Sequence, residues 1–171
     1  MKFRVATLDD YDRILFIITT ARAFLKDNAI PQWQGPYPNE DDITQDIQCG
    51  YNYVLDDDGE VVGTVALVLG EEPTYHVIQE GEWLTQDSPY LTIHRLAVDE
   101  RFRSKGLAHL LIKGSEEIAR RKQAVSIRVD THYQNEAMTS LLLKHDYIYC
   151  GVVIMDDGTL RRAYEKVLEQ S

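Results

Sequence analysis

The feature that most constrains this fold is a strand, a helix and a second strand that follow one another within about 40 residues. Residues 90–98 form a largely apolar run typical of a strand, apolar residues repeat at helical spacing over 107–121, and residues 125–131 form another strand. We expect Leu107, Leu111 and Ile118 to be buried on the helix, with Leu110 beside them. A crossover of this length joins parallel strands, so the sheet must contain a parallel pair.

Antiparallel hairpins are predicted on either side of this crossover. Residues 51–55 and 60–69 flank an Asp-Gly turn at Gly59, and residues 147–155 and 160–168 flank a second one at Gly158. The other expected elements are a strand over 3–6 and helices over 9–27, 39–50 and 135–144. The prediction is therefore an α/β fold whose sheet is mixed but mostly antiparallel, flanked by helices.

Composition narrows the class of protein. A chain of 171 residues with 44% hydrophobic residues suits one domain over 1–171. The net charge of −10 argues against nucleic acid or an anionic membrane as partner. The polar N-terminus resembles no signal peptide, so a cytoplasmic location is expected. The cysteines, Cys49 and Cys150, have no spacing typical of a metal site and are expected to be buried or half-buried thiols; no metal is predicted.

The charge is unevenly distributed along the chain. Residues 95–122 contain eight Lys and Arg against four acids, so this segment is basic in an acidic protein. The asymmetry suggests an anionic ligand here and a cationic one elsewhere. A solvated helix face that is simply basic explains the count equally well, and charge alone leaves both interpretations open.

The same segment carries a phosphate-binding pattern. The strand over 90–98 leads into a short loop with Gly106, and a helix begins there, so successive backbone N–H groups point at one spot at the positive end of a helix dipole. Arg103 and Lys105 add charge. A nucleotide-hydrolysing P-loop is excluded because Lys105 precedes the glycine, and a dinucleotide fingerprint because its other glycines are missing.

At this point the sequence resembles the GCN5-related N-acetyltransferase superfamily. Its signature, Gln/Arg-x-x-Gly-x-Gly/Ala after a hydrophobic strand, is matched by the six residues from Arg103 to Ala108. Arg95-Leu96-Ala97-Val98 before the loop also fits, as does a later Asn135 that leads through a helix to the aromatic Tyr147. The order of elements agrees over nearly the whole chain.

The resemblance implies acetyl-coenzyme A as cosubstrate and a central parallel strand pair that splays apart to admit it. The backbone of Leu96, Ala97 and Val98 would pair with the pantetheine arm, and one N–H there would polarise the thioester carbonyl. Asn135 would touch the pantetheine. The pyrophosphate would bind the loop of Arg103, Ser104, Lys105, Gly106, Leu107 and Ala108.

One departure affects the chemistry. The family often has a Tyr seven residues after the Asn, as the acid that protonates the departing thiolate, and here that position is Leu142. His94, His132 and Tyr133 are therefore the candidate catalytic residues, because histidine titrates near neutral pH and a phenol can donate a proton. Each could equally be a packed side chain or, for His132, a helix-entry residue.

Three residues are candidates for the acceptor site. Trp33 and Tyr37 lie in a proline-rich loop that borders the acceptor pocket in this superfamily, and Asp130 could hold a cationic amine. A hydrophobic plug for the aromatics and a helix cap for Asp130 are the alternatives. A long insertion over 70–89, with Tyr75, Trp83 and several acids, is either functional or a solvated flap.

The predicted function is N-acetyl transfer to a primary amine of a small molecule or peptide, by direct attack in a ternary complex. Two other functions stay open: an acyl-coenzyme A sensor without catalysis, suggested by Leu142, and acetylation of protein N-termini or lysines. The sequence does not decide the acceptor, the acyl length, or whether the chain is a homodimer.

Overall fold

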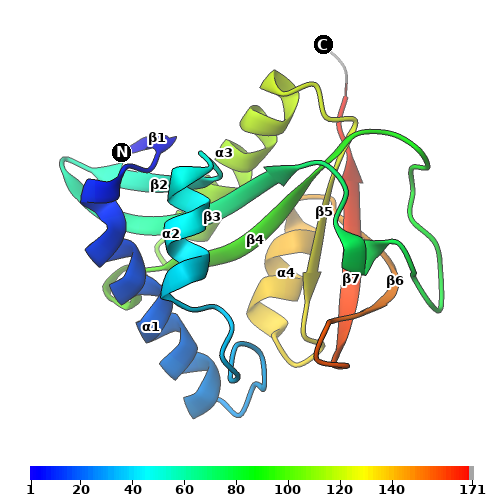
Figure 1. The fold of residues 1–171 in the computed structure, drawn as a ribbon, viewed down its shortest axis with the longest axis horizontal. Coiled ribbons are helices and arrows are strands. Elements are labelled where there is room, and N and C mark those ends of the chain that lie inside the picture. The colour runs from blue at the N-terminus through cyan, green and yellow to red at the C-terminus, as the bar shows by residue number, and fades with distance from the viewer. Residues whose placement is uncertain (170–171) are drawn as a thin grey trace. The chain divides into compact units, whose positions relative to one another are not determined.

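The computed structural model describes residues 1–169, which form two compact units. The first comprises residues 1–67 and 94–114, and the second comprises residues 68–93 and those from 115 onward. Strand β4 (Tyr90–Val98) and helix α3 (Leu107–Arg121) each run from one unit into the other. The strands form a seven-stranded sheet in the order β1-β2-β3-β4-β5-β7-β6 (Figure 1).

In the first unit, three antiparallel strands precede the basic loop. They are β1 (Lys2–Val5), β2 (Asn52–Asp57) and β3 (Glu60–Leu69). Helices α1 (Tyr11–Asp27) and α2 (Glu40–Gln48) lie side by side (Figure 1). Helix α2 begins at a capping box, in which Asn39 and Asp42 satisfy each other's backbone N–H groups. A short 3-10 turn, η3 (Glu100–Phe102), follows β4.

In the second unit, β4 pairs with β5 (Ser126–Thr131) in parallel, as the crossover requires. Strand β7 (Leu160–Val167) lies between β5 and β6 (Ile148–Ile154) and is antiparallel to both (Figure 1). Helix α4 (Glu136–Lys144) connects β5 to β6. The register of the parallel pair joins Tyr90 to Ser126, Leu91 to Ile127 and Thr92 to Arg128.

The insertion over 70–89 is a packed part of the second unit. It contains one 3-10 turn, η2 (Pro73–Tyr75), and its Tyr75 and Trp83 are only 1% and 6% exposed. Gln79 pairs with Val152 of β6 through two 2.8 Å backbone hydrogen bonds. The flap interpretation of this segment is therefore wrong, because its aromatic side chains are part of a hydrophobic core that also contains Tyr90, Cys150, Val153 and Ala163.

The predicted fold class is confirmed, and β4 and α3 have the predicted bounds. Two details differ. On α3, Leu107 and Leu111 are buried as predicted and Ile118 is half-buried, but Leu110 is 41% exposed while Ile112 is fully buried, because the buried face extends toward Ile112 and not toward Leu110. The first helix begins with a 3-10 turn, η1 (Leu8–Asp10), before α1.

The sequence also led to expectations about the two cysteines and about the domain organisation. The expectation of buried or half-buried thiols is confirmed for Cys150 and wrong for Cys49, which is exposed near the end of α2. Burial raises the pKa of the Cys150 thiol to about 11, which keeps it protonated. The single-domain organisation over 1–171 stays a prediction. Within residues 1–169, each helix is too short or too polar to cross a lipid bilayer.

Candidate cofactor and catalytic sites

The loop between β4 and α3 has the backbone geometry of an anion site. Ser104 and Gly106 have φ values of +65° and +81°, in the left-handed region. A Cβ built on Gly106 meets no atom within 4 Å, so open space lies against the backbone there. The first helical bond joins Leu110 N to Gly106 O, so the N–H groups of the preceding turn have no intrahelical acceptor. The predicted pyrophosphate loop therefore has room and donors for an anion.

A buried carboxylate holds the start of this loop. Asp99 is fully buried and accepts hydrogen bonds from Arg13 Nη2 at 2.5 Å, Arg101 Nη2 at 3.0 Å and the Arg101 backbone N–H at 2.9 Å. These bonds, led by that of the Arg101 side chain, hold the pKa of Asp99 well below its usual range although burial opposes them. Because Arg13 belongs to α1, the pair links this helix to the end of β4.

The cationic side chains of the loop rest on aromatic rings. The Arg103 guanidinium carbon lies 3.6 Å from the centre of the Phe24 ring, and Lys105 Nζ lies 5.9 Å from that of Phe102. Such cation–π contacts are weak where solvent reaches them. Arg103 and Lys105 thus keep their charge next to the loop and can turn toward a phosphate at small cost.

Sequence reasoning missed a strained position within β4. Arg95 has a φ of +51°, which is rare for a side chain of this size. Its guanidinium binds both oxygens of Asp46 on α2, at 2.6 and 2.7 Å, and also contacts the Tyr37 hydroxyl. Burial raises the pKa of Asp46, and the Arg95 charge opposes the shift. Strain held by a buried ion pair is typical of functional sites, but a single sequence does not show backbone angles.

The candidate acceptor aromatics have structural partners in the first unit. Trp33 packs against the core formed by α1, α2 and β2, as the plug interpretation expects. Tyr37 is 43% exposed and lies over the Arg95 guanidinium at 5.6 Å. Neither contact excludes an acceptor role, because the Tyr37 ring keeps a solvent-facing surface; both assignments stay predictions.

The two candidate catalytic residues at the end of β5 stack on each other. The rings of His132 and Tyr133 are 4.6 Å apart at an angle of 30°. His132 is 8% exposed and its Nδ1 accepts a 3.1 Å hydrogen bond from the Gln134 backbone N–H. Burial, with a smaller contribution from Arg161, lowers the pKa of His132. The ring is therefore neutral at pH 7 with its proton on Nε2. The third candidate, His94, lies half-buried on β4.

Other predicted site residues of the second unit have partners of their own. Asp130 accepts a 2.6 Å hydrogen bond from the Tyr75 hydroxyl, and the N-cap of the next helix is Asn135 instead. Asn135 caps α4 by accepting from Met138 N at 3.2 Å, in addition to any contact with pantetheine. Leu142 is fully buried, so this position contributes packing and no proton donor.

Comparison with known proteins identifies the family. The model described as the Acetyltransferase (GNAT) family matches residues 21–147, which is most of the chain, so this chain belongs to the GNAT acetyltransferase family. A GNAT-family acetyltransferase structure from Streptococcus agalactiae is 37% identical, with 99% of this chain and 96% of that chain covered and a TM-score of 0.90.

Two further relatives are more distant. The uncharacterized N-acetyltransferase YesJ of Bacillus subtilis is 27% identical over 148 residues, covering 85% of this chain and 81% of the relative. The structure of yncA from Salmonella typhimurium, a putative acetyltransferase with its cofactor acetyl-CoA, is 17% identical. It covers 100% of this chain and 95% of that one with a TM-score of 0.68, a likeness that concerns the fold alone.

Proposed function

We propose that this chain is an acetyl-coenzyme A-dependent N-acetyltransferase acting on a primary amine of a small molecule or peptide. The observation that carries the proposal is the loop before α3, where open space lies against the Gly106 backbone and the helix begins with N–H groups that precede its first intrahelical bond. Membership of an acetyltransferase family and the acetyl-CoA in the Salmonella yncA structure support the same ligand.

The residues divide into binding and reacting groups. The loop over 103–108 would bind the pyrophosphate, the backbone of Leu96–Val98 and Asn135 the pantetheine arm, and a β4 amide would polarise the thioester carbonyl. The acceptor nitrogen would then attack the carbonyl carbon directly. The new C–N bond forms, the C–S bond breaks, and coenzyme A leaves as a thiolate that takes up the proton lost from the amine.

Without a tyrosine at position 142, the thiolate needs another donor or water. His132 is neutral with its proton on Nε2, so it would stabilise the sulfur by donating a hydrogen bond; the adjacent Tyr133, 57% exposed, could do so through its hydroxyl. His94 stays a candidate for taking the amine proton. A location in the cytoplasm is part of the same proposal.

Release of free coenzyme A tests the activity. Purified protein is mixed with acetyl-coenzyme A and with small amines, amino acids or peptides, and the thiol is detected; amine-dependent release is expected. Rates measured against both substrates should give the intersecting pattern of a ternary complex, whereas a ping-pong pattern would contradict direct attack. Binding without release for any amine would instead favour the acyl-coenzyme A sensor suggested by Leu142.

Kinetics of variants test whether His132 and Tyr133 donate a hydrogen bond to the departing thiolate. Once an acceptor is known, His132→Ala or Tyr133→Phe should lower kcat by roughly 10²-fold while the KM for acetyl-coenzyme A changes little, because donor help acts on the transition state. If neither variant nor the pair changes kcat more than a few-fold, water is the donor and the assignment is wrong.

A further inference from the structure

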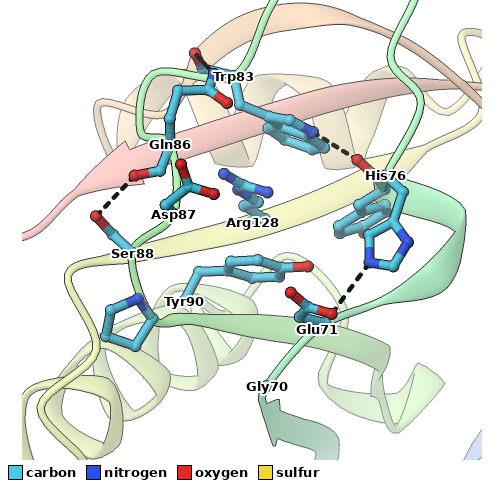
Figure 2. A pocket seen from close by; sticks show the side chains of 11 residues that line it. Gly70, Glu71, His76, Trp83, Gln86, Asp87, Ser88, Tyr90 and Arg128 are labelled. Carbon is cyan, nitrogen blue, oxygen red and sulfur yellow. Dashed lines mark hydrogen bonds and ion pairs between the residues drawn. The ribbon is translucent and has the colours of Figure 1, made fainter.

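The second unit contains a cavity of about 570 Å³ that the acetyl-transfer proposal does not use. Its lining comes from the insertion over 70–89, from Tyr90 at the start of β4 and from Arg128 on β5 (Figure 2). None of these residues belongs to the predicted acetyl-coenzyme A set. The volume is in the range of pockets that hold small molecules.

Arg128 is the polar group at the centre of this cavity. It is 6% exposed, and its guanidinium lies between the rings of Trp83 and Tyr90, at 4.3 and 4.0 Å from their centres (Figure 2). Nε donates to Glu165 at 3.0 Å and Nη2 donates to the Thr85 carbonyl at 2.8 Å. Among residues 1–169, Nη1 has no hydrogen-bond partner, and yet Arg128 lines the cavity.

Glu165 pairs with Arg128 through Nε and, within the described part of the chain, leaves Nη1 without an acceptor. This carboxylate is fully buried and is satisfied by several donors besides Arg128. They are Leu84 N at 2.7 Å, Thr85 N at 3.3 Å, Thr85 Oγ1 at 2.6 Å and Ser126 Oγ at 2.5 Å. The network fixes the guanidinium in its slot, so the two N–H groups of Nη1 are pre-oriented for an anionic oxygen.

The opposite charge lines the same cavity. Glu71 and Asp87 are exposed lining residues, and Glu71 also lies 3.4 Å from His76 Nε2. Asp87 has a φ of +52° and forms no ion pair among the described residues. Two carboxylates near the solvent side suit an ammonium group. The cavity thus offers a cationic donor at its base, acids at its rim and aromatic walls.

We propose that this cavity is a binding site for a small zwitterion of the amino-acid class, separate from the acetyl-transfer site. The ligand's carboxylate accepts from Arg128 Nη1, its ammonium faces Asp87 and Glu71, and its side chain packs on the parts of Trp83 and Tyr90 that line the cavity. A carboxylate alone would leave Asp87 without a cation to face, and an amine alone would leave Arg128 Nη1 without an acceptor.

Fluorine NMR tests the proposal on the full chain. The protein has two tryptophans, Trp33 and Trp83, so labelling with 5-fluorotryptophan gives two signals, which Trp33→Phe assigns. L-leucine, up to about 10 mM, should shift the Trp83 signal and leave the Trp33 signal in place. Its two fragments, 4-methylpentanoate and isoamylamine, should bind at least about tenfold more weakly, because each makes only one of the charged contacts.

Substitutions of lining and non-lining residues test whether binding depends on the cavity. Glu71→Gln with Asp87→Asn should weaken L-leucine binding about tenfold, while the control Glu80→Gln with Glu82→Gln, exposed acids of the same insertion that do not line the cavity, should leave it unchanged. Arg128→Gln should abolish binding, with folding checked by the dispersion of the amide spectrum. No shift at Trp83, a shift at Trp33 alone, or equal binding of 4-methylpentanoate would overturn the proposal, whatever the acetyl-transfer assay shows.

Discussion

Gly106 is the residue on which the proposed cofactor binding depends most directly. A glutamate there would place a side chain and a negative charge in the open space against the loop backbone, so Gly106→Glu should lower the affinity for acetyl-coenzyme A by at least about 10²-fold. Titration calorimetry measures this. Gly50→Glu is the matched control, since Gly50 also has a positive φ (+73°) and open space and lies outside the loop. Equal affinity in the Gly106 variant and wild type would remove the basis of the proposed site.

Asp99 gives a prediction about pH. Its pKa is lowered in the folded chain relative to its ordinary value of 3.8, so its pairing with Arg13 and Arg101 stabilises the fold above that value and is lost as pH falls through the lowered one. Asp99→Asn should cost roughly 2 kcal/mol at pH 7, the scale of charge-assisted hydrogen bonds. Urea unfolding at pH 7 and pH 3 should show the difference shrinking in acid. A cost that is the same at both pH values would contradict the charge argument.

Among the elements, the insertion over 70–89 is the segment for which the structure most changes the sequence-based interpretation. Trp83 packs at 5.0 Å from the Tyr75 ring, donates from Nε1 to the Tyr75 carbonyl at 2.9 Å and covers Arg128. We expect Trp83→Ala to destabilise the protein by about 3–5 kcal/mol, as for other buried aromatics.

A residue of the same insertion provides the comparison. Val77 is 67% exposed, so Val77→Ala should change stability by less than about 0.5 kcal/mol. Thermal unfolding of both variants distinguishes a packed insertion from a flap, because a flap would tolerate both substitutions equally.

For the whole molecule, we expect the melting temperature to depend on which ligand is present. A ligand that binds only the folded state stabilises it by about 2.7 kcal/mol at 100 times its Kd. Acetyl-coenzyme A and coenzyme A should therefore raise the melting temperature by several degrees, and ATP and NAD much less, because the loop lacks their fingerprints. A larger shift with either nucleotide would favour a different ligand for the loop.

The sequence by itself determined the class of fold and indicated the candidate cofactor loop. The apolar run over 90–98, the helical period over 107–121 and the Asp-Gly turns are local signals, so they predicted the bounds of β4 and α3 and the presence of both hairpins. The candidate loop could be picked out in the same way, because Arg103, Lys105 and Gly106 lie close together in the chain and would act through their own backbone and charge.

Only the tertiary structure decided the partners of the polar residues. Arg95 with Asp46, Asp99 with Arg13, and Arg128 with Glu165 are 49, 86 and 37 residues apart in the chain. No local pattern links such positions, because the energy of a buried ion pair depends on distance and desolvation that the fold alone sets. The cavity around Arg128 exists for the same reason, since packing fixes which donor of a buried guanidinium is left facing open space.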